Sequence, residues 1–290
     1  MNLDIEKYNL KTITPNFCSG ANGNKAEIRP SSIKGALRYW FRAAIAEENI
    51  KNMHERENEI FGSTDKSSSF AVKVLNILEV NKTSNKARMK PVPRPTKNFR
   101  NEAVKQDINI DIELILHSSE FKSEIKSTFD IFLMLGSFGQ RSRRGFGSIQ
   151  RRQNKYSDTE DFLCSLKEKL QTLNDSEITI KDNILKINNR NSLEYPYIKE
   201  VFIGSNNEKF SRKELLKQIS MSSHKNPYDE LGSFKPRMAS PVYVTIKEIN
   251  DDFFPVITKL NPVYPNDNYN NSEEKINNFI KDLRDLNYGT

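Results

Sequence analysis

Residues 28–42 read IRPSSIKGALRYWFR, and this stretch predicts an amphipathic helix. Pro30, Ser31 and Ser32 are residue types that commonly begin a helix. Apolar side chains then recur at the spacing of one helix face: Ile33, Leu37, Trp40, Phe41, Ala44 and Ile45. We expect the helix to run to about Glu48, with both aromatic side chains of this apolar stripe packed in the core.

Basic side chains also recur at a regular spacing along the same predicted helix. Lys34, Arg38 and Arg42 are spaced by four, so they stack on one face. Cations in a row beside the free N–H groups of a helix N-terminus suit a phosphodiester chain. Because residues 29–46 contain no Asp or Glu, pairing within the helix cannot explain the row. The row and Ser32 are predicted to contact RNA phosphates, and an ordinary solvated face is the alternative.

The rest of the first half predicts one recognisable order of elements. Strand patterns cover residues 3–14, 69–80, 108–116 and 148–152. A second helical apolar period covers residues 120–135, and residues 54–60 also favour a helix. The order strand, helix, strand, strand, helix, strand is the ferredoxin-like split βαβ pattern.

A loop rich in glycine and arginine precedes the last of these strands. Residues 136–147 read GSFGQRSRRGFG, with four glycines and three arginines. Glycines let a backbone approach an anion closely, and the arginines would surround it. The segment lacks the GxxxxGK[ST] sequence and the strand-to-helix context of a nucleotide-binding P-loop. We predict RNA contact by six residues of this Gly-Arg loop: Gly139, Arg141, Arg143, Arg144, Gly145 and Gly147.

Residues 81–107 form a long, basic connection between two predicted strands. They hold eight Lys and Arg residues, and Glu102 is the only acid before Asp107. Three prolines stiffen the middle of the segment. Connections of this length are usually functional or disordered. The segment is predicted to order on an RNA backbone, with a solvated mobile loop as the alternative.

The second half partly repeats the order of the first. Helices are predicted at 158–173, 211–221 and 272–286, and strands at 197–203, 241–249 and 253–260. Ser211 and Glu214 have the spacing of a capping box at the second of these helices. We therefore expect an α+β protein with two ferredoxin-like (RRM-like) domains, residues 1–155 and a degenerate second domain at 156–290.

Charge is distributed unevenly between these halves. Residues 1–155 hold 27 Lys and Arg against 17 Asp and Glu, a balance of +10. Residues 156–290 hold 18 against 21, a balance of −3, and the two balances sum to the +7 of the chain. This asymmetry favours a surface for a polyanion in the first half and a protein partner for the second.

Several classes of protein do not fit the sequence. No apolar run approaches the roughly 18 residues that a membrane-spanning helix needs, so no membrane partner is expected. The first residues show no secretory signal, which favours a cytoplasmic protein. Cys18 and Cys164 lack the spacing of a zinc site or disulfide framework and are expected to be unpaired thiols. No cofactor or metal is implied.

The helix motif at 28–42 followed by the Gly-Arg loop resembles the RAMP superfamily of CRISPR effector proteins. The segment KPRMASPVY at 235–243 resembles a motif in the second domain of the first RAMP subunits of type III-B Cmr complexes. The resemblance implies a subunit near the 3′ part of the guide RNA (crRNA), beside other RAMP subunits. It would hold guide RNA and target single-stranded RNA without cutting either. Lys235 and Arg237 become RNA-contact candidates through this likeness.

Two other functions stay open. Some RAMP relatives are metal-independent endoribonucleases that process the guide with a histidine near the first helix. His54, His117 and His224 lie in no convincing constellation, and no cluster of carboxylates predicts a metal site, so we expect no catalysis. A pure protein scaffold is the remaining alternative.

Overall fold

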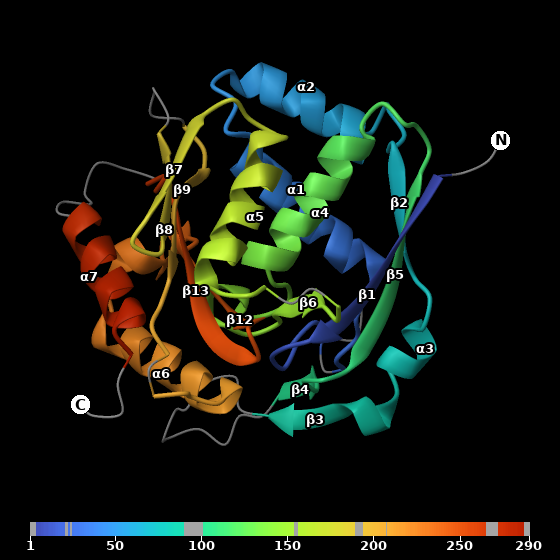
Figure 1. The fold of residues 1–290 in the computed structure, drawn as a ribbon. Coiled ribbons are helices and arrows are strands. Elements are labelled where there is room, and N and C mark those ends of the chain that lie inside the picture. Colours follow the sequence, from blue (N-terminus) through green and yellow to red (C-terminus); the bar gives the residue numbers. More distant parts are fainter. Residues whose placement is uncertain are drawn as a thin grey trace.

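Two large antiparallel sheets with helices between them form the body of the described structure, which also contains two short two-stranded sheets. A computed structural model describes residues 4–20, 23, 25–89, 101–153, 156–188, 194–206, 208–264 and 272–286. Helices α1, α4 and α5 form the layer between the two sheets, and α6 and α7 cover the outer face of the second sheet (Figure 1). The expected α+β class is confirmed.

The first sheet has the strand order β2-β5-β1-β6. Its strands are β1 (Asp4–Thr12), β2 (Phe70–Val74), β5 (Asn109–Leu116) and β6 (Ile149–Arg151). Helix α1 (Pro30–Ile45) connects β1 to β2 around β5, and α4 (Lys122–Leu135) connects β5 to β6 around β1. These two interleaved units are the ferredoxin-like arrangement that the sequence predicts for this half.

Helix α1 forms because its apolar stripe is buried. Its buried side chains are Ile33, Leu37, Trp40, Phe41, Ala43 and Ala44. Trp40 is 1% exposed and Phe41 0%, and burial of one such side chain contributes roughly 1.5–3 kcal/mol. The helix ends at Ile45, earlier than expected, because Ala46 adopts a left-handed conformation with φ of 46°. A separate helix, α2 (Ile50–Phe61), follows and is capped by the Asn49 side chain.

The expected strand at residues 69–80 is wrong in its second half. The strand at 69–80 ends at Val74, and residues 77–80 form the short helix α3 (Ile77–Val80). The Asn76 amide group bonds to the backbone of Asn109 and Asp111 in β5 and so ends the pairing of β2.

The connection at 81–107 contains regular structure, and its ordering on an RNA backbone stays a prediction. After a short 3-10 turn (Thr83–Asn85), β3 (Lys86–Met89) pairs with β4 (Asn101–Val104). Two backbone hydrogen bonds of 2.9 Å between Val104 and Asn16 attach β4 to the first half. Residues 90–100, which hold the three prolines and half of the basic side chains, lie outside the described residues.

The second sheet has the strand order β12-β13-β9-β8-β7. Its strands are β7 (Glu177–Lys181), β8 (Ile184–Asn188), β9 (Ile198–Ile203), β12 (Val242–Ile249) and β13 (Asp252–Leu260). The helices of this half are α5 (Thr159–Gln171), α6 (Arg212–Lys225) and α7 (Ser272–Arg284). Between α6 and β12 lie a 3-10 turn (Asp229–Leu231) and the hairpin of β10 (Ser233–Phe234) and β11 (Arg237–Met238).

The second half is degenerate in a specific way. Helix α6 connects β9 to β12 around β13, which makes one split βαβ unit. The position beside β9 is filled by β8, which precedes β9 in the chain instead of following α7. The hairpin β7–β8 was not predicted, whereas the capping box of Ser211 and Glu214 is confirmed. The domain boundary after residue 155 stays a prediction, since one core cluster contains side chains from both halves.

The two sheets meet where the edge strands β6 and β12 lie side by side. Ser148 Oγ donates to the carbonyl oxygen of Ile246 at 2.7 Å. The Gln150 side chain donates to the Glu248 carbonyl at 2.7 Å and accepts from the Glu248 N–H at 3.0 Å. Lys247, which is fully buried, donates to the Ile149 carbonyl at 3.0 Å. Side chains therefore replace a continuous backbone ladder at this junction.

Two further features concern the whole described part of the chain. Cys18 is buried and Cys164 exposed, and both are free thiols as predicted. Among the described residues no helix has the length and apolarity needed to cross a bilayer.

Lys247 should make folding stability depend on pH. Burial lowers the pKa of Lys247 from 10.5 to about 7. Between these values the unfolded chain holds a proton on this side chain that the folded chain lacks, so the contribution to stability rises with pH. The slope reaches at most about 1.4 kcal/mol per pH unit. We expect urea unfolding to show the free energy of unfolding of wild type rising relative to that of Lys247→Met between about pH 7.5 and pH 9.5. A difference that is constant across this range would contradict the lowered pKa.

Candidate functional site

The predicted basic row lies on one face of α1, but part of it is used inside the protein. Lys34 Nζ donates to Ser68 Oγ at 2.7 Å and to the Phe70 carbonyl at 3.1 Å. Burial, and secondly the neighbouring Arg38, lowers the pKa of Lys34. Ser32 Oγ accepts from the Cys18 thiol at 3.3 Å.

Arg38 and Arg42 share one carboxylate that comes from another helix. Arg38 Nε lies 3.2 Å and Arg42 Nη1 3.6 Å from the Glu57 carboxylate of α2. Glu57 is 4% exposed, whereas each arginine side chain keeps 37% of its surface exposed. Two guanidinium groups on one carboxylate leave an excess of positive charge at the surface. The row therefore keeps donors for an external anion while it fixes α2 against α1.

The glycines of the Gly-Arg loop serve close packing within the chain. Gly139, Gly145 and Gly147 have φ values of 92°, 84° and 73°, which L side chains rarely adopt. A Cβ atom on Gly147 would lie 2.0 Å from the Phe138 carbonyl oxygen. A Cβ atom on Gly145 would lie 2.9 Å from a methyl carbon of Leu216 in α6. These contacts explain the glycines without RNA, and their predicted approach to RNA stays a prediction.

Arg143 fixes the start of β12 to α1. Its guanidinium donates to the Ser240 carbonyl at 2.6 Å and to the Tyr39 hydroxyl at 3.1 Å. The same group lies over the rings of Tyr39 and Tyr243, 5.2 and 5.3 Å from their centroids. Such cation–π contacts and hydrogen bonds hold the side chain in one orientation.

Arg144 reaches further into the second half. It donates to the carbonyls of Leu231 and Val242, both at 3.1 Å, and lies 5.2 Å from the centroid of the Phe279 ring in α7. Burial, and secondly the charge of Arg143, lowers the pKa of Arg144 to about 10, so the group stays charged at neutral pH. RNA contact by these two arginines stays a prediction, but the structure gives both of them partners inside the protein.

The hairpin β10–β11 presents the other predicted cations. Lys235 and Arg237 are both exposed at its tip. Phe234 beside them is 84% exposed, although it is a large aromatic side chain. Leu231 and Ser240, which accept hydrogen bonds from Arg144 and Arg143, flank this hairpin in the chain.

The predicted site residues thus fall into two groups. The row on α1 faces α2 and the segment before β2, whereas the Gly-Arg loop contacts the second half and the base of the β10–β11 hairpin. Arg141 is exposed on the same loop. Phe234 and Glu57 were not predicted from the sequence. The signal for Phe234 was an aromatic residue next to Lys-Pro-Arg in a turn, whereas no local signal links Glu57 to α1.

The histidines lie apart from one another. His54 is exposed on α2, and His224 is exposed in the last turn of α6. His117 follows β5, and its Nδ1 lies 3.1 Å from the Ser68 carbonyl oxygen. Across the described ranges no group of three or more His, Cys, Asp or Glu side chains is placed to hold a metal ion.

Alanine at position 147 should destabilise the protein strongly. A left-handed conformation costs an alanine about 1–2 kcal/mol, and the contact with Phe138 adds about 1–3 kcal/mol. We expect Gly147→Ala to lower the free energy of unfolding by about 3 kcal/mol in urea titrations. The matched control is Gly35→Ala in α1, where a Cβ meets nothing within 4 Å. This control should raise stability by about 0.8 kcal/mol. Equal effects of the two substitutions would contradict the packing role of Gly147.

Comparisons with known proteins agree with this architecture. Residues 9–150 match the family model of the RAMP superfamily. The Cmr subunit Cmr1-2 of Pyrococcus furiosus is 28% identical over 174 residues, which are 49% of this chain and 92% of that protein. The subunit Cmr1-1 of the same organism is 27% identical over 172 residues, 50% of this chain and 47% of that protein.

Two solved structures cover nearly the whole chain. The crystal structure of Cmr1 from Pyrococcus furiosus in its apo form superposes with a TM-score of 0.67 at 20% identity, over 97% of this chain and 96% of that one. A chain of the type III-B Cmr-beta complex bound to cognate target RNA has a TM-score of 0.60 at 12% identity, over 98% of this chain and 100% of that one. At these identities the superpositions show a shared fold. The family match over residues 9–150, where the interleaved βαβ units lie, shows that this half of the chain belongs to the RAMP superfamily.

Proposed function

We propose that the chain is a non-catalytic, RNA-binding subunit of a type III-B CRISPR ribonucleoprotein complex. In that complex it would hold the guide RNA near its 3′ part, together with target RNA, beside other RAMP subunits. Homology to Cmr1 subunits supports membership of such a complex. One observation carries the RNA-binding role: the exposed aromatic and basic tip of the β10–β11 hairpin.

The hairpin tip combines the two features that single-stranded RNA requires. Phe234 offers an exposed ring on which any base can stack, and Lys235 and Arg237 beside it can neutralise phosphates. An 84% exposed phenylalanine loses nearly all the benefit of burial, so its ring is available to a ligand. Stacking and phosphate contacts do not depend on base identity. This fits a machine in which base pairing reads the sequence, as in DNA-targeting effectors.

The Gly-Arg loop holds the base of the β10–β11 hairpin, whose tip is the proposed RNA-binding surface. Arg144 and Arg143 bond to Leu231 and Ser240, the carbonyls on either side of the hairpin. We assign these arginines to positioning the hairpin, and the exposed Arg141 to phosphate contact. The excess charge of Arg38 and Arg42 gives a second phosphate-contacting surface on α1, to which Lys34 and Ser32 belong.

The positions of the histidines support a role without catalysis. General acid–base cleavage of RNA needs two or more groups within reach of one phosphodiester. His54 lies on α2, His117 follows β5 and His224 lies on α6, and among the described residues no side chain pairs with any of them.

Loss of a phosphate-contacting side chain should reduce the salt dependence of RNA binding. We expect Arg237→Ala to weaken binding of an unstructured RNA and to lower the slope of log K against log salt by about 0.7. The control is Lys181→Ala, an exposed lysine at the far edge of the second sheet, which should leave the slope unchanged. The measurement is fluorescence anisotropy over a salt series, followed by a denaturing gel of the RNA. Discrete cleavage products would instead support the endoribonuclease, and absence of RNA binding would support the scaffold.

Arg144 should behave differently from Arg237. Arg144→Ala leaves two buried carbonyls without their charged donor, so we expect a loss of at least about 2 kcal/mol in the free energy of unfolding. Arg237→Ala, at an exposed tip, should change stability by less than about 0.5 kcal/mol. Chemical denaturation of both variants compares these values. If Arg144→Ala kept full stability and lowered the salt slope, Arg144 would be a phosphate ligand and its positioning role would be wrong.

A further inference from the structure

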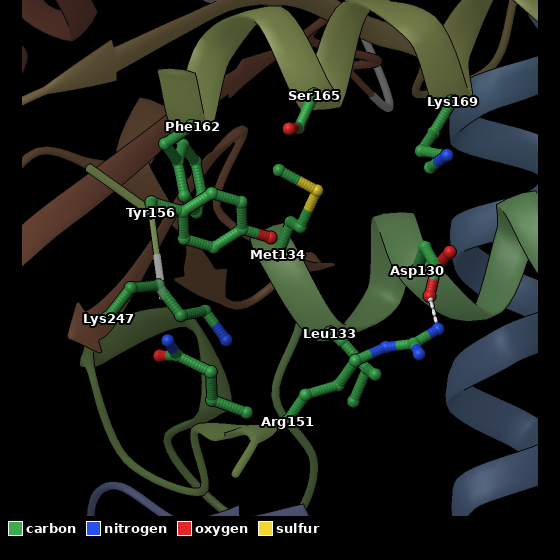
Figure 2. A pocket seen from close by; sticks show the side chains of 10 residues that line it. Asp130, Leu133, Met134, Arg151, Tyr156, Phe162, Ser165, Lys169 and Lys247 are labelled. Carbon is green, nitrogen blue, oxygen red and sulfur yellow. Dashed lines mark hydrogen bonds and ion pairs between the residues drawn. The ribbon is translucent and has the colours of Figure 1, made fainter. Parts of the chain in front are cut away.

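A cavity of about 280 Å³ lies at the junction of the two halves, apart from the surfaces described above. It is bounded by α4, α5, β6 and β12, and Figure 2 shows side chains from these elements arranged around one shared space. The lining residues are Asp130, Leu133, Met134, Gln150, Arg151, Tyr156, Phe162, Ser165, Lys169 and Lys247.

Positive charge exceeds negative charge in this lining. Lys247, Arg151 and Lys169 face a single carboxylate, that of Asp130. Asp130 is already engaged, since it accepts a charge-assisted hydrogen bond from Arg151. Among the described residues, no side chain or backbone group pairs with the side chain of Lys169, or with that of Ser165 one turn before it on α5. Both side chains extend from α5 toward the cavity (Figure 2).

Lys247 is the most unusual member of this group. It is 0% exposed, and its ammonium donates to two backbone carbonyls, of Ile149 at 3.0 Å and Gly136 at 3.3 Å. Neither acceptor carries a charge, and within the described part of the chain no carboxylate lies in ion-pair range of it. Burial disfavours the charged form of this side chain and so lowers its pKa, and an anion in the adjoining cavity would favour the charged form again. An ammonium has three N–H groups, so one is left to donate to such an anion.

We propose that this cavity binds a small phosphate-bearing anion. Lys247 and Lys169 would hold the phosphate from opposite walls, and Arg151 would add a guanidinium donor. The volume lies near the lower end of the range of small-molecule sites, roughly 300–1,000 Å³, so inorganic phosphate or one nucleotide is the size that fits. Tyr156 and Phe162, whose ring centroids are 4.9 Å apart, and Met134 form an apolar wall suited to the uncharged part of a nucleotide.

Titration with inorganic phosphate and with AMP tests this site on the full chain. Potassium chloride keeps the ionic strength constant, and calorimetry and the unfolding temperature report binding. We expect saturable binding of one anion per chain, with a rise in unfolding temperature that follows occupancy. Lys169→Met and Lys247→Met should each weaken binding by about tenfold or more.

Matched variants separate the site from general charge effects. Lys167→Met changes a lysine of the same helix that does not line the cavity, and it should bind the anion as wild type does. Lys247 also supports the fold. If Lys247→Met does not fold, Lys169→Met and Ser165→Ala test anion binding in the cavity. Absence of saturable binding, or equal affinity in Lys169→Met, Lys167→Met and wild type, would show that the cavity is a structural void.

The phosphate could belong to a free molecule or to the end of an RNA chain. Two short RNAs of one sequence, with and without a terminal phosphate, distinguish these sources by their competition with AMP. Displacement by the phosphorylated RNA alone would identify the chain end as the ligand, whereas displacement by neither would identify the free anion. This site does not depend on the proposed RNA surface, because RNA binding by the hairpin can fail while AMP still binds.

Discussion

The insertion of Arg144 between the two halves is the interaction on which the rest of the structure depends. The residue belongs to the loop that ends the first half, yet its guanidinium bonds to carbonyls before and within β12 and lies over a ring of α7. The N–H of Gly145 donates to Val244 at 2.9 Å, and only a residue without Cβ lets the loop approach α6 so closely. The start of β12 and the base of the β10–β11 hairpin take their positions from this docking.

At this junction, side-chain cations bonded to carbonyl oxygens connect the two halves in place of backbone strand pairing. Arg144, Arg143 and Lys247 each donate to carbonyl oxygens of the neighbouring half. A buried cation bonded to neutral acceptors is costly, but it is strongly specific, since displacement would leave a charge and several carbonyls unpaired. Two sheets that meet edge to edge could otherwise slide along each other. We infer that these buried cations lower the stability of the junction but fix one register of β6 against β12.

The periodicity of apolar residues along the chain was enough to predict most of the fold. Periodicity located α1, α4, α5 and the strands of both sheets other than β7 and β8, because each buries a single face and therefore repeats at 3.6 or 2 residues. The hairpin β7–β8 was missed although its signal was present: Asp182 and Asn183 turn it with φ values of 52° and 59°. Strands β3 and β4, each four residues long, have mixed polar composition and owe their place to Asn16, which is far away in sequence.

The candidate site was less predictable because the partners of its cations are not local. The α1 row lacks acids within its own helix, and no pattern in the sequence indicates that Glu57 of α2 lies beside Arg38 and Arg42. The arginines of the Gly-Arg loop have the composition of an anion site, but composition does not distinguish a phosphate oxygen from a backbone carbonyl as acceptor.

The net charge of each half did not predict where a polyanion can bind, because it does not show which cations are already bonded inside the protein. Two arginines of the basic half are engaged inside the protein, whereas the exposed pair Lys235 and Arg237 belongs to the half with a net negative charge. What decides where a polyanion can bind is the set of donors left after internal carbonyls and carboxylates are satisfied. By that measure the proposed RNA surface spans both halves, with the Gly-Arg loop as the support that connects them.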